Sequence, residues 1–131
     1  MEDLTRDGII SVEDLPLERV EVPEWNGVVY MRVLTGKQRD EFEQLATDRR
    51  AAKRFECKEI MVRMIQMSLC DKSGKLLFAG HEDAQKLNEK SAAVLIRLFK
   101  VVQKISKISD EDMAEISADF VDGPNANSGS D

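Results

Sequence analysis

The sequence has few of the residues on which catalytic and metal sites usually depend. Its 131 residues include two cysteines, Cys57 and Cys70, and one histidine, His81. The cysteines lie in a helical pattern without metal-ligand spacing, so we expect buried thiols in a reducing compartment. His81 has no cysteine or serine in a suggestive relation to it, which argues against a histidine-based triad. Each carboxylate cluster is placed to cap a helix. We therefore predict a non-enzymatic protein with no metal or other cofactor.

Patterns for nucleotide binding and for membrane insertion are also missing. Gly36-Lys37 lacks the upstream glycine and the Ser or Thr of a P-loop, and no G-x-G-x-x-G occurs. No apolar run approaches the ~20 residues that cross a bilayer. The acidic start MEDLTRDG is not a signal peptide. A net charge of −6 argues against nucleic acid. We expect an intracellular protein with no membrane partner, and the charge disfavours a nucleic-acid partner.

The strongest positive feature is an apolar helical segment, Ser91 to Ile108. Its apolar arc spans roughly 180°, wider than the ~100° stripe that docks a surface helix onto one core. Such a helix needs protein on more than one side, from its own domain or from another copy, and the pattern alone leaves both alternatives open. The arc is formed by Val94, Leu95, Leu98, Phe99, Val101, Val102, Ile105 and Ile108.

From this segment we predict a protein-interaction surface. Its apolar part would be Leu95, Leu98, Phe99, Val102 and Ile105, and its basic part the line Arg97, Lys100, Lys104 and Lys107. Acidic complements follow in Asp110, Glu111, Asp112 and Glu115. Head-to-tail pairing of such unlike surfaces builds rings or open spirals.

A β-hairpin is predicted near the N-terminus, because Asn26-Gly27 separates two runs rich in β-formers. A two-residue loop would place Val22 opposite Met31 and Glu21 opposite Arg32. Pro23 removes one ladder donor, so its strand should be an edge.

Helices account for most of the remaining chain. Thr35 and Gln38 form a capping box, and a break near 47–54 is favoured over one helix through residues 37–70. Asp71 to Gly74 has the composition of a type I turn, and residues 81–87 read as a short helix. Ser109 to Asp112 would cap a last helix with Met113, Ile116 and Phe120 on its apolar edge.

Together these elements predict a mainly α (α+β) fold, with several helices around a central apolar helix and an N-terminal β-hairpin. We expect a loose acidic N-terminus over residues 1–18, one domain over 19–121 and a disordered tail over 122–131.

The order of these signals resembles the tail assembly chaperones of long-tailed bacteriophages with non-contractile tails. It is carried by VPEWNGVVYMRVLTG (22–36), Arg39, Phe42-Glu43, CDKSGKLLF (70–78), Asp83, Leu87, Ser91 and ISDED (108–112). The similarity covers roughly residues 20–115 and consists of spacings more than of chemically demanding residues.

The resemblance implies a function in the host cytoplasm. Such chaperones self-associate, coat the tape measure protein, and leave as tail tube subunits polymerise, so they are absent from the mature virion. A ribosomal frameshift commonly yields a longer form whose extension recruits the tail tube protein. Asp122 to Asp131 lacks that extension, so this chain resembles the shorter form.

A second hypothesis is a small helical regulator or adaptor that binds one folded partner. A DNA-binding version would use Arg49, Arg50, Lys53 and Arg54. The absence of interleaved aromatics favours a solvated helix face for those residues instead.

Overall fold

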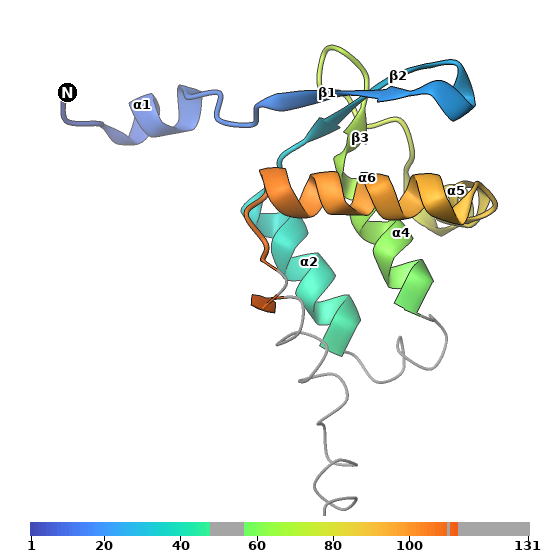
Figure 1. The fold of residues 1–131 in the computed structure, drawn as a ribbon. Coiled ribbons are helices and arrows are strands. Elements are labelled where there is room, and N and C mark those ends of the chain that lie inside the picture. Colours follow the sequence, from blue (N-terminus) through green and yellow to red (C-terminus); the bar gives the residue numbers. More distant parts are fainter. Residues whose placement is uncertain (48–56, 110, 113–131) are drawn as a thin grey trace, which may run out of the picture.

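The computed structural model describes residues 1–47, 57–109, 111 and 112. Three antiparallel strands in the order β1-β2-β3 form a small sheet, with α2, α4 and α6 on one side of it (Figure 1). The predicted α+β class and the N-terminal hairpin are confirmed. In chain order the elements are α1 (Arg6–Ser11), β1 (Leu17–Val22), the 3-10 helix η1 (Pro23–Trp25), β2 (Gly27–Arg32), α2 (Gly36–Thr47), α4 (Cys57–Ser68), β3 (Leu69–Cys70), α5 (Gly80–Asn88) and α6 (Ala92–Ile105).

The hairpin has a longer turn than predicted, so its predicted register was wrong. Val22 pairs with Gly27 and Glu21 with Val28. Pro23 begins η1 instead of ending the strand, since its fixed φ suits a turn and its missing N–H costs nothing there. The shift is an even number of residues, so each side chain keeps its predicted face. Val22 and Met31 are both fully buried on the inner side.

The hydrophobic core lies between the sheet and the helices. Helix α4 packs against α2, α5 and α6, while α6 packs against both α4 and β2. Both α4 and α6 are therefore central to the fold. Helix α4 is buried continuously from Met64 to Ser68. The core includes Val22, Met31, Phe42, Val62, Met64, Ile65, Leu69, Leu87, Val94, Leu95, Leu98, Val102 and Ile108.

Two of the predicted local signals, a capping box and a turn, are confirmed, whereas no acidic residue lies in the first turn of α2. Thr35 Oγ1 accepts from the Gln38 N–H and Gln38 Oε1 from the Thr35 N–H, each at 3.0 Å, which is the predicted capping box. The Gly74 N–H donates to the Asp71 carbonyl at 2.9 Å, which confirms the turn. Gly74 has a φ of 91°, a conformation that favours glycine.

The ends of the chain and the 37–70 region are described in part. The segment expected to be loose contains the short helix α1, and β1 begins at Leu17. Helix α2 ends at Thr47 and α4 begins at Cys57, so the predicted break near 47–54 lies outside the described residues from residue 48 onward. So do the apolar edge of the last helix and the tail over 122–131.

Candidate interaction surface

The wide apolar arc of α6 is covered largely by the subunit itself. Leu95, Leu98 and Val102 are at most 2% exposed, which makes them core residues. Phe99 and Ile105 are half-buried and pack against the same core. Because α6 has β2 on one side and α4 on another, its own fold accounts for the arc. Of the predicted apolar surface, only Phe99 and Ile105 have area open to a partner.

The basic line runs past the end of the helix. Arg97, Lys100 and Lys104 are exposed on α6, whereas Lys107 follows the helix. Helix α6 ends at Ile105, three residues earlier than predicted. Lys107 has a φ of 56°, and the Ile108 N–H donates to the Gln103 carbonyl at 2.8 Å. This is a Schellman-type end, and buried Ile108 supplies its apolar contact.

Arg97 is already engaged inside the subunit. Its Nη1 and Nη2 donate to Glu24 Oε2 and Oε1 at 2.9 and 3.0 Å, a two-bond ion pair between α6 and the hairpin turn. These hydrogen bonds lower the pKa of the Glu24 carboxyl below its ordinary value. A partner would have to compete with Glu24 for Arg97, so the positive charge open to a partner comes from the three lysines.

A hollow of about 360 Å³ lies beside two of those lysines. Lys100 and Lys104 line it together with Gln103, Ile108 and Ser109, so it combines positive charge with some apolar wall. We call Lys100, Lys104, Lys107 and this hollow the lysine groove. No ion pair involving these three lysines occurs within residues 1–47, 57–109, 111 and 112.

The predicted acidic complement is described only at Glu111 and Asp112. Asp112 is used locally: its Oδ2 accepts from the Ser109 N–H, and its own N–H donates to Ser109 Oγ, both at 3.0 Å. These bonds, led by the one from the Ser109 backbone, lower the pKa of Asp112. The predicted cap is therefore present. Because Asp112 makes these local hydrogen bonds, it is less available to pair with a lysine of another copy.

Side chains that could hold a metal ion or act as a nucleophile are sparse among the residues that the structure describes. No group of three or more His, Cys, Asp or Glu side chains is placed there to hold a metal ion. Burial raises the pKa of the Cys70 thiol, which disfavours the nucleophilic thiolate. None of the described helices has the length and apolar character required to cross a bilayer.

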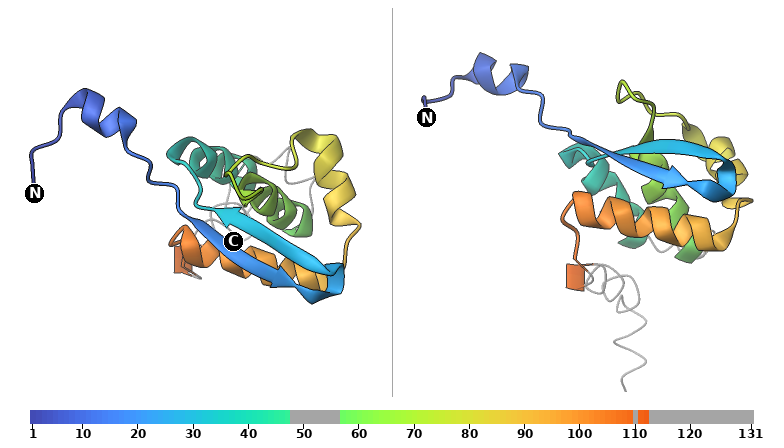
Figure 2. Two further views of the ribbon diagram at one scale, coloured as in Figure 1. Left: turned by 90° about the horizontal axis from the view of Figure 1, so that it is seen from above. Right: turned by 45° about the horizontal axis from the view of Figure 1, so that its top comes forward.

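Sequence reasoning missed the N-terminal arm, which we define as residues 1–15. It extends away from the body (Figures 1 and 2), and none of its helical residues is buried. Leu4, Ile9, Ile10 and Val12 are each at least half exposed. The available signal was the presence of these apolar residues, with Thr5 as a helix cap, in a stretch otherwise read as acidic and loose.

The fold thus defines a small α+β protein that exposes charged side chains on α6 and apolar side chains on the N-terminal arm. Among solved structures it is similar to one titled "Structure of bacteriophage HK97 tail assembly chaperone". The TM-score is 0.54 at 22% sequence identity, and the match covers 69% of this chain and 84% of that chain. At this identity the match establishes a shared fold. No protein-family model matches the chain, and no curated protein sequence matches it.

Proposed function

We propose that the chain is a non-enzymatic tail assembly chaperone that self-associates and coats the tape measure protein of a bacteriophage. The observation that carries the proposal is the fold shared with the HK97 tail assembly chaperone over 84% of that protein. The order of sequence signals over residues 20–115 supports it independently. It would act in the host cytoplasm and be absent from the mature virion, with the tail tube protein recruited by a longer frameshifted form.

The described surface is compatible with this role. Coating a long helical client requires many weak, repeated contacts, whose effect multiplies when neighbouring copies also bind one another. The exposed residues of the predicted interaction surface, Arg97, Lys100, Lys104 and Lys107, lie beside half-buried Phe99 and Ile105. Contacts of this kind are individually modest, which suits a coat that must later be removed.

The test is co-expression with tape measure fragments of increasing length, followed by affinity capture of the fragment. We expect the number of chains captured per fragment to rise with fragment length, because a coat adds copies along its client. An unrelated coiled coil of equal length is the matched control and should capture none. Capture of one chain at every length would instead favour a stoichiometric adaptor. If no fragment captures the chain, the tape measure protein is not its partner, either as a coated client or as the partner of an adaptor.

A further inference from the structure

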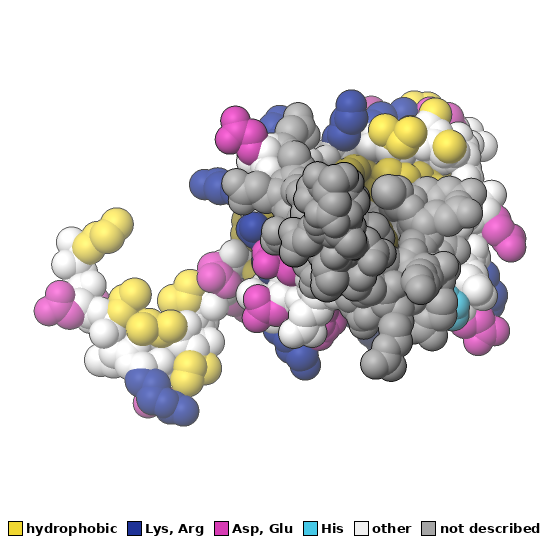
Figure 3. Space-filling view, turned by 90° about the horizontal axis from the view of Figure 1, so that it is seen from below, with side chains coloured by type: hydrophobic (Ala, Val, Ile, Leu, Met, Phe, Trp, Pro, Cys, Tyr) yellow, Lys and Arg dark blue, Asp and Glu magenta, His cyan; other side chains and the backbone are white. Residues whose placement is uncertain are grey.

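The N-terminal arm contains a helix, and none of the residues in that helix is buried against the described part of its own subunit. Its apolar side chains gather along it at a distance from the body (Figure 3), and Leu4 and Ile10 are 66% and 64% exposed. Among the described residues, the first hydrogen bond between this end of the chain and the body is made just after the arm, from the Val33 N–H to the Pro16 carbonyl. The arm therefore leaves the body at the start of β1.

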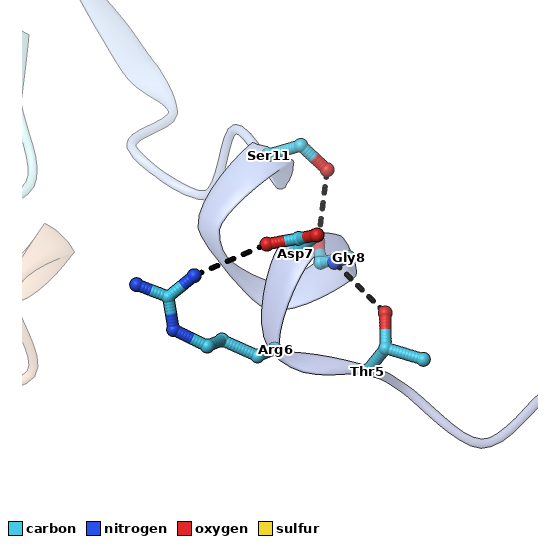
Figure 4. Close-up of polar contacts among 5 residues, drawn as sticks. All are labelled: Thr5, Arg6, Asp7, Gly8 and Ser11. Carbon is cyan, nitrogen blue, oxygen red and sulfur yellow. Dashed lines mark hydrogen bonds and ion pairs between the residues drawn. The ribbon is translucent and has the colours of Figure 1, made fainter.

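Local hydrogen bonds shape the arm into a helix (Figure 4). Thr5 Oγ1 accepts from the Gly8 N–H at 3.1 Å, the Ser11 hydroxyl donates to the Gly8 carbonyl at 3.0 Å, and Arg6 pairs with Asp7 at 3.2 Å. A six-residue helix is too short to be stable alone in water, because nucleation costs more than so few bonds return. An arm with this local order and exposed apolar side chains needs a docking surface.

Charge indicates which surface fits. The arm carries five carboxylates, at Glu2, Asp3, Asp7, Glu13 and Asp14, against a single arginine, Arg6. The lysine groove offers the complement: three exposed lysines without an ion pair in the described part of the chain, and a hollow of about 360 Å³ lined by Lys100 and Lys104. The methylene stems of these lysines supply its apolar wall. An isoleucine or leucine of the arm would enter the hollow while arm carboxylates meet Lys100, Lys104 and Lys107.

The subunit's own groove lies near the base of the arm. Leu17 pairs with Arg32 at the start of β1, and the Leu34 N–H donates to Ser106 Oγ beside the end of α6. The arm nevertheless points outward in both views of Figure 2. The occupant that fits an outward arm is the corresponding groove of a second copy.

We propose that the N-terminal arm of one copy docks in the lysine groove of the next. Donor and acceptor surfaces differ, so each copy can give its arm to one neighbour and receive an arm from another. Such heterologous contacts build rings when they close and open spirals when they do not. This inference rests on the self-association in the proposed function and names the contact that would produce it.

Three variants and one control test the contact by sedimentation velocity across a concentration series. The first lacks residues 1–15. The second is the groove variant K100E/K104E/K107E. The third is an arm variant, I9D/I10D, which removes the apolar contact and leaves the arm in place. The matched control K72E/K75E/K90E makes the same change of charge at exposed lysines elsewhere. Circular dichroism melting on each sample checks that the body is folded.

We expect the full chain and the control to form larger species as concentration rises, and the other three to stay monomeric. Mixing the arm-deleted chain with the groove variant should restore a dimer and nothing larger, because one supplies a groove and the other an arm. Unchanged association after arm deletion would overturn the inference, as would an equal loss in the control. Failure of the mixture to form a dimer would place any arm contact within one subunit and would also overturn it.

The experiments distinguish failure of the arm inference from failure of the proposed function. If the arm inference alone fails, the arm-deleted chain still self-associates and is still captured along the tape measure fragments. If the proposed function fails, the full chain is not captured by those fragments, whatever the arm does to self-association. The arm-deleted chain should be captured with a number of copies that rises less steeply with fragment length, because cooperation between neighbours is lost.

Discussion

Helix α6 and the N-terminal arm both carry many apolar side chains, and they differ in what covers them. On α6, Leu98 and Val102 are fully buried between β2 and α4. On the arm, Ile9 and Ile10 are more than half exposed. The more apolar segment, α6, is therefore already covered by its own subunit. The shorter, acidic arm leaves its apolar side chains exposed. The width of an apolar arc shows how many neighbours a helix needs, whereas its packing shows whether those neighbours belong to the same chain.

The largest expected difference between the two regions is in stability. Leu98→Ala should lower the free energy of unfolding by about 2–5 kcal/mol, since it leaves a cavity at a fully buried position. Ile10→Ala should change it by less than about 0.5 kcal/mol, because the arm lies outside the core. Urea denaturation followed by circular dichroism, at a concentration where the chain is monomeric, measures both. A loss above about 1 kcal/mol for Ile10→Ala would show that the arm packs on its own subunit.

Two threonine caps allow a closer comparison of the same regions. Thr5 and Thr35 accept equivalent N-cap hydrogen bonds, at 3.1 and 3.0 Å. Thr35→Ala should cost about 1 kcal/mol of unfolding free energy, since α2 is part of the cooperative fold. Thr5→Ala should leave that free energy unchanged, because fraying of α1 does not unfold the body. Urea titrations of both variants test this. Equal losses would mean that the arm and the body unfold as one unit.

The end of α6 gives a prediction in the stabilising direction. Lys107 is a non-glycine residue with a φ of 56°, which is strained for an L-residue. Lys107→Gly should raise the free energy of unfolding by up to about 1 kcal/mol. Lys104→Gly, within the last turn, removes the same charge and should lower it by about 0.5–1 kcal/mol. Thermal melts of the pair separate backbone from charge. A loss for both would show that the lysine side chain matters more than the backbone conformation.

Much of the local structure was predictable because its signals are local. The capping box at Thr35 and Gln38 and the turn from Asp71 to Gly74 each depend on residues three positions apart. The existence of the hairpin and the face on which each side chain lies were predictable, whereas the register of its two strands was not. Asn26-Gly27 is a strong hairpin signal, yet Pro23 starts a 3-10 turn that lengthens the loop. A proline beside an Asn-Gly pair leaves more than one loop length open.

The candidate surface was less predictable because it depends on distant partners. Nothing within α6 indicates that Arg97 pairs with Glu24, which lies 73 positions away along the chain. A helical wheel also places Leu95 and Phe99 on one arc without distinguishing a core residue from a half-buried one. For the arm, the few apolar residues among carboxylates gave little periodicity, so a short helix was not expected.

The smallest expected effect concerns ion pairs, one in each region. Glu24 has its pKa lowered by the hydrogen bonds from Arg97, so its folded-state pKa lies below its unfolded-state value. The stabilisation is then present above the unfolded pKa, about 4.3, and is lost as pH falls through the folded pKa. Glu24→Gln should therefore lower the urea midpoint slightly at pH 7 and not at pH 3. Asp7→Asn, which removes the exposed Arg6–Asp7 pair of the arm, should leave the midpoint unchanged at both. An equal deficit for Glu24→Gln at pH 7 and pH 3 would mean that the side chain acts through packing and that its charge contributes nothing.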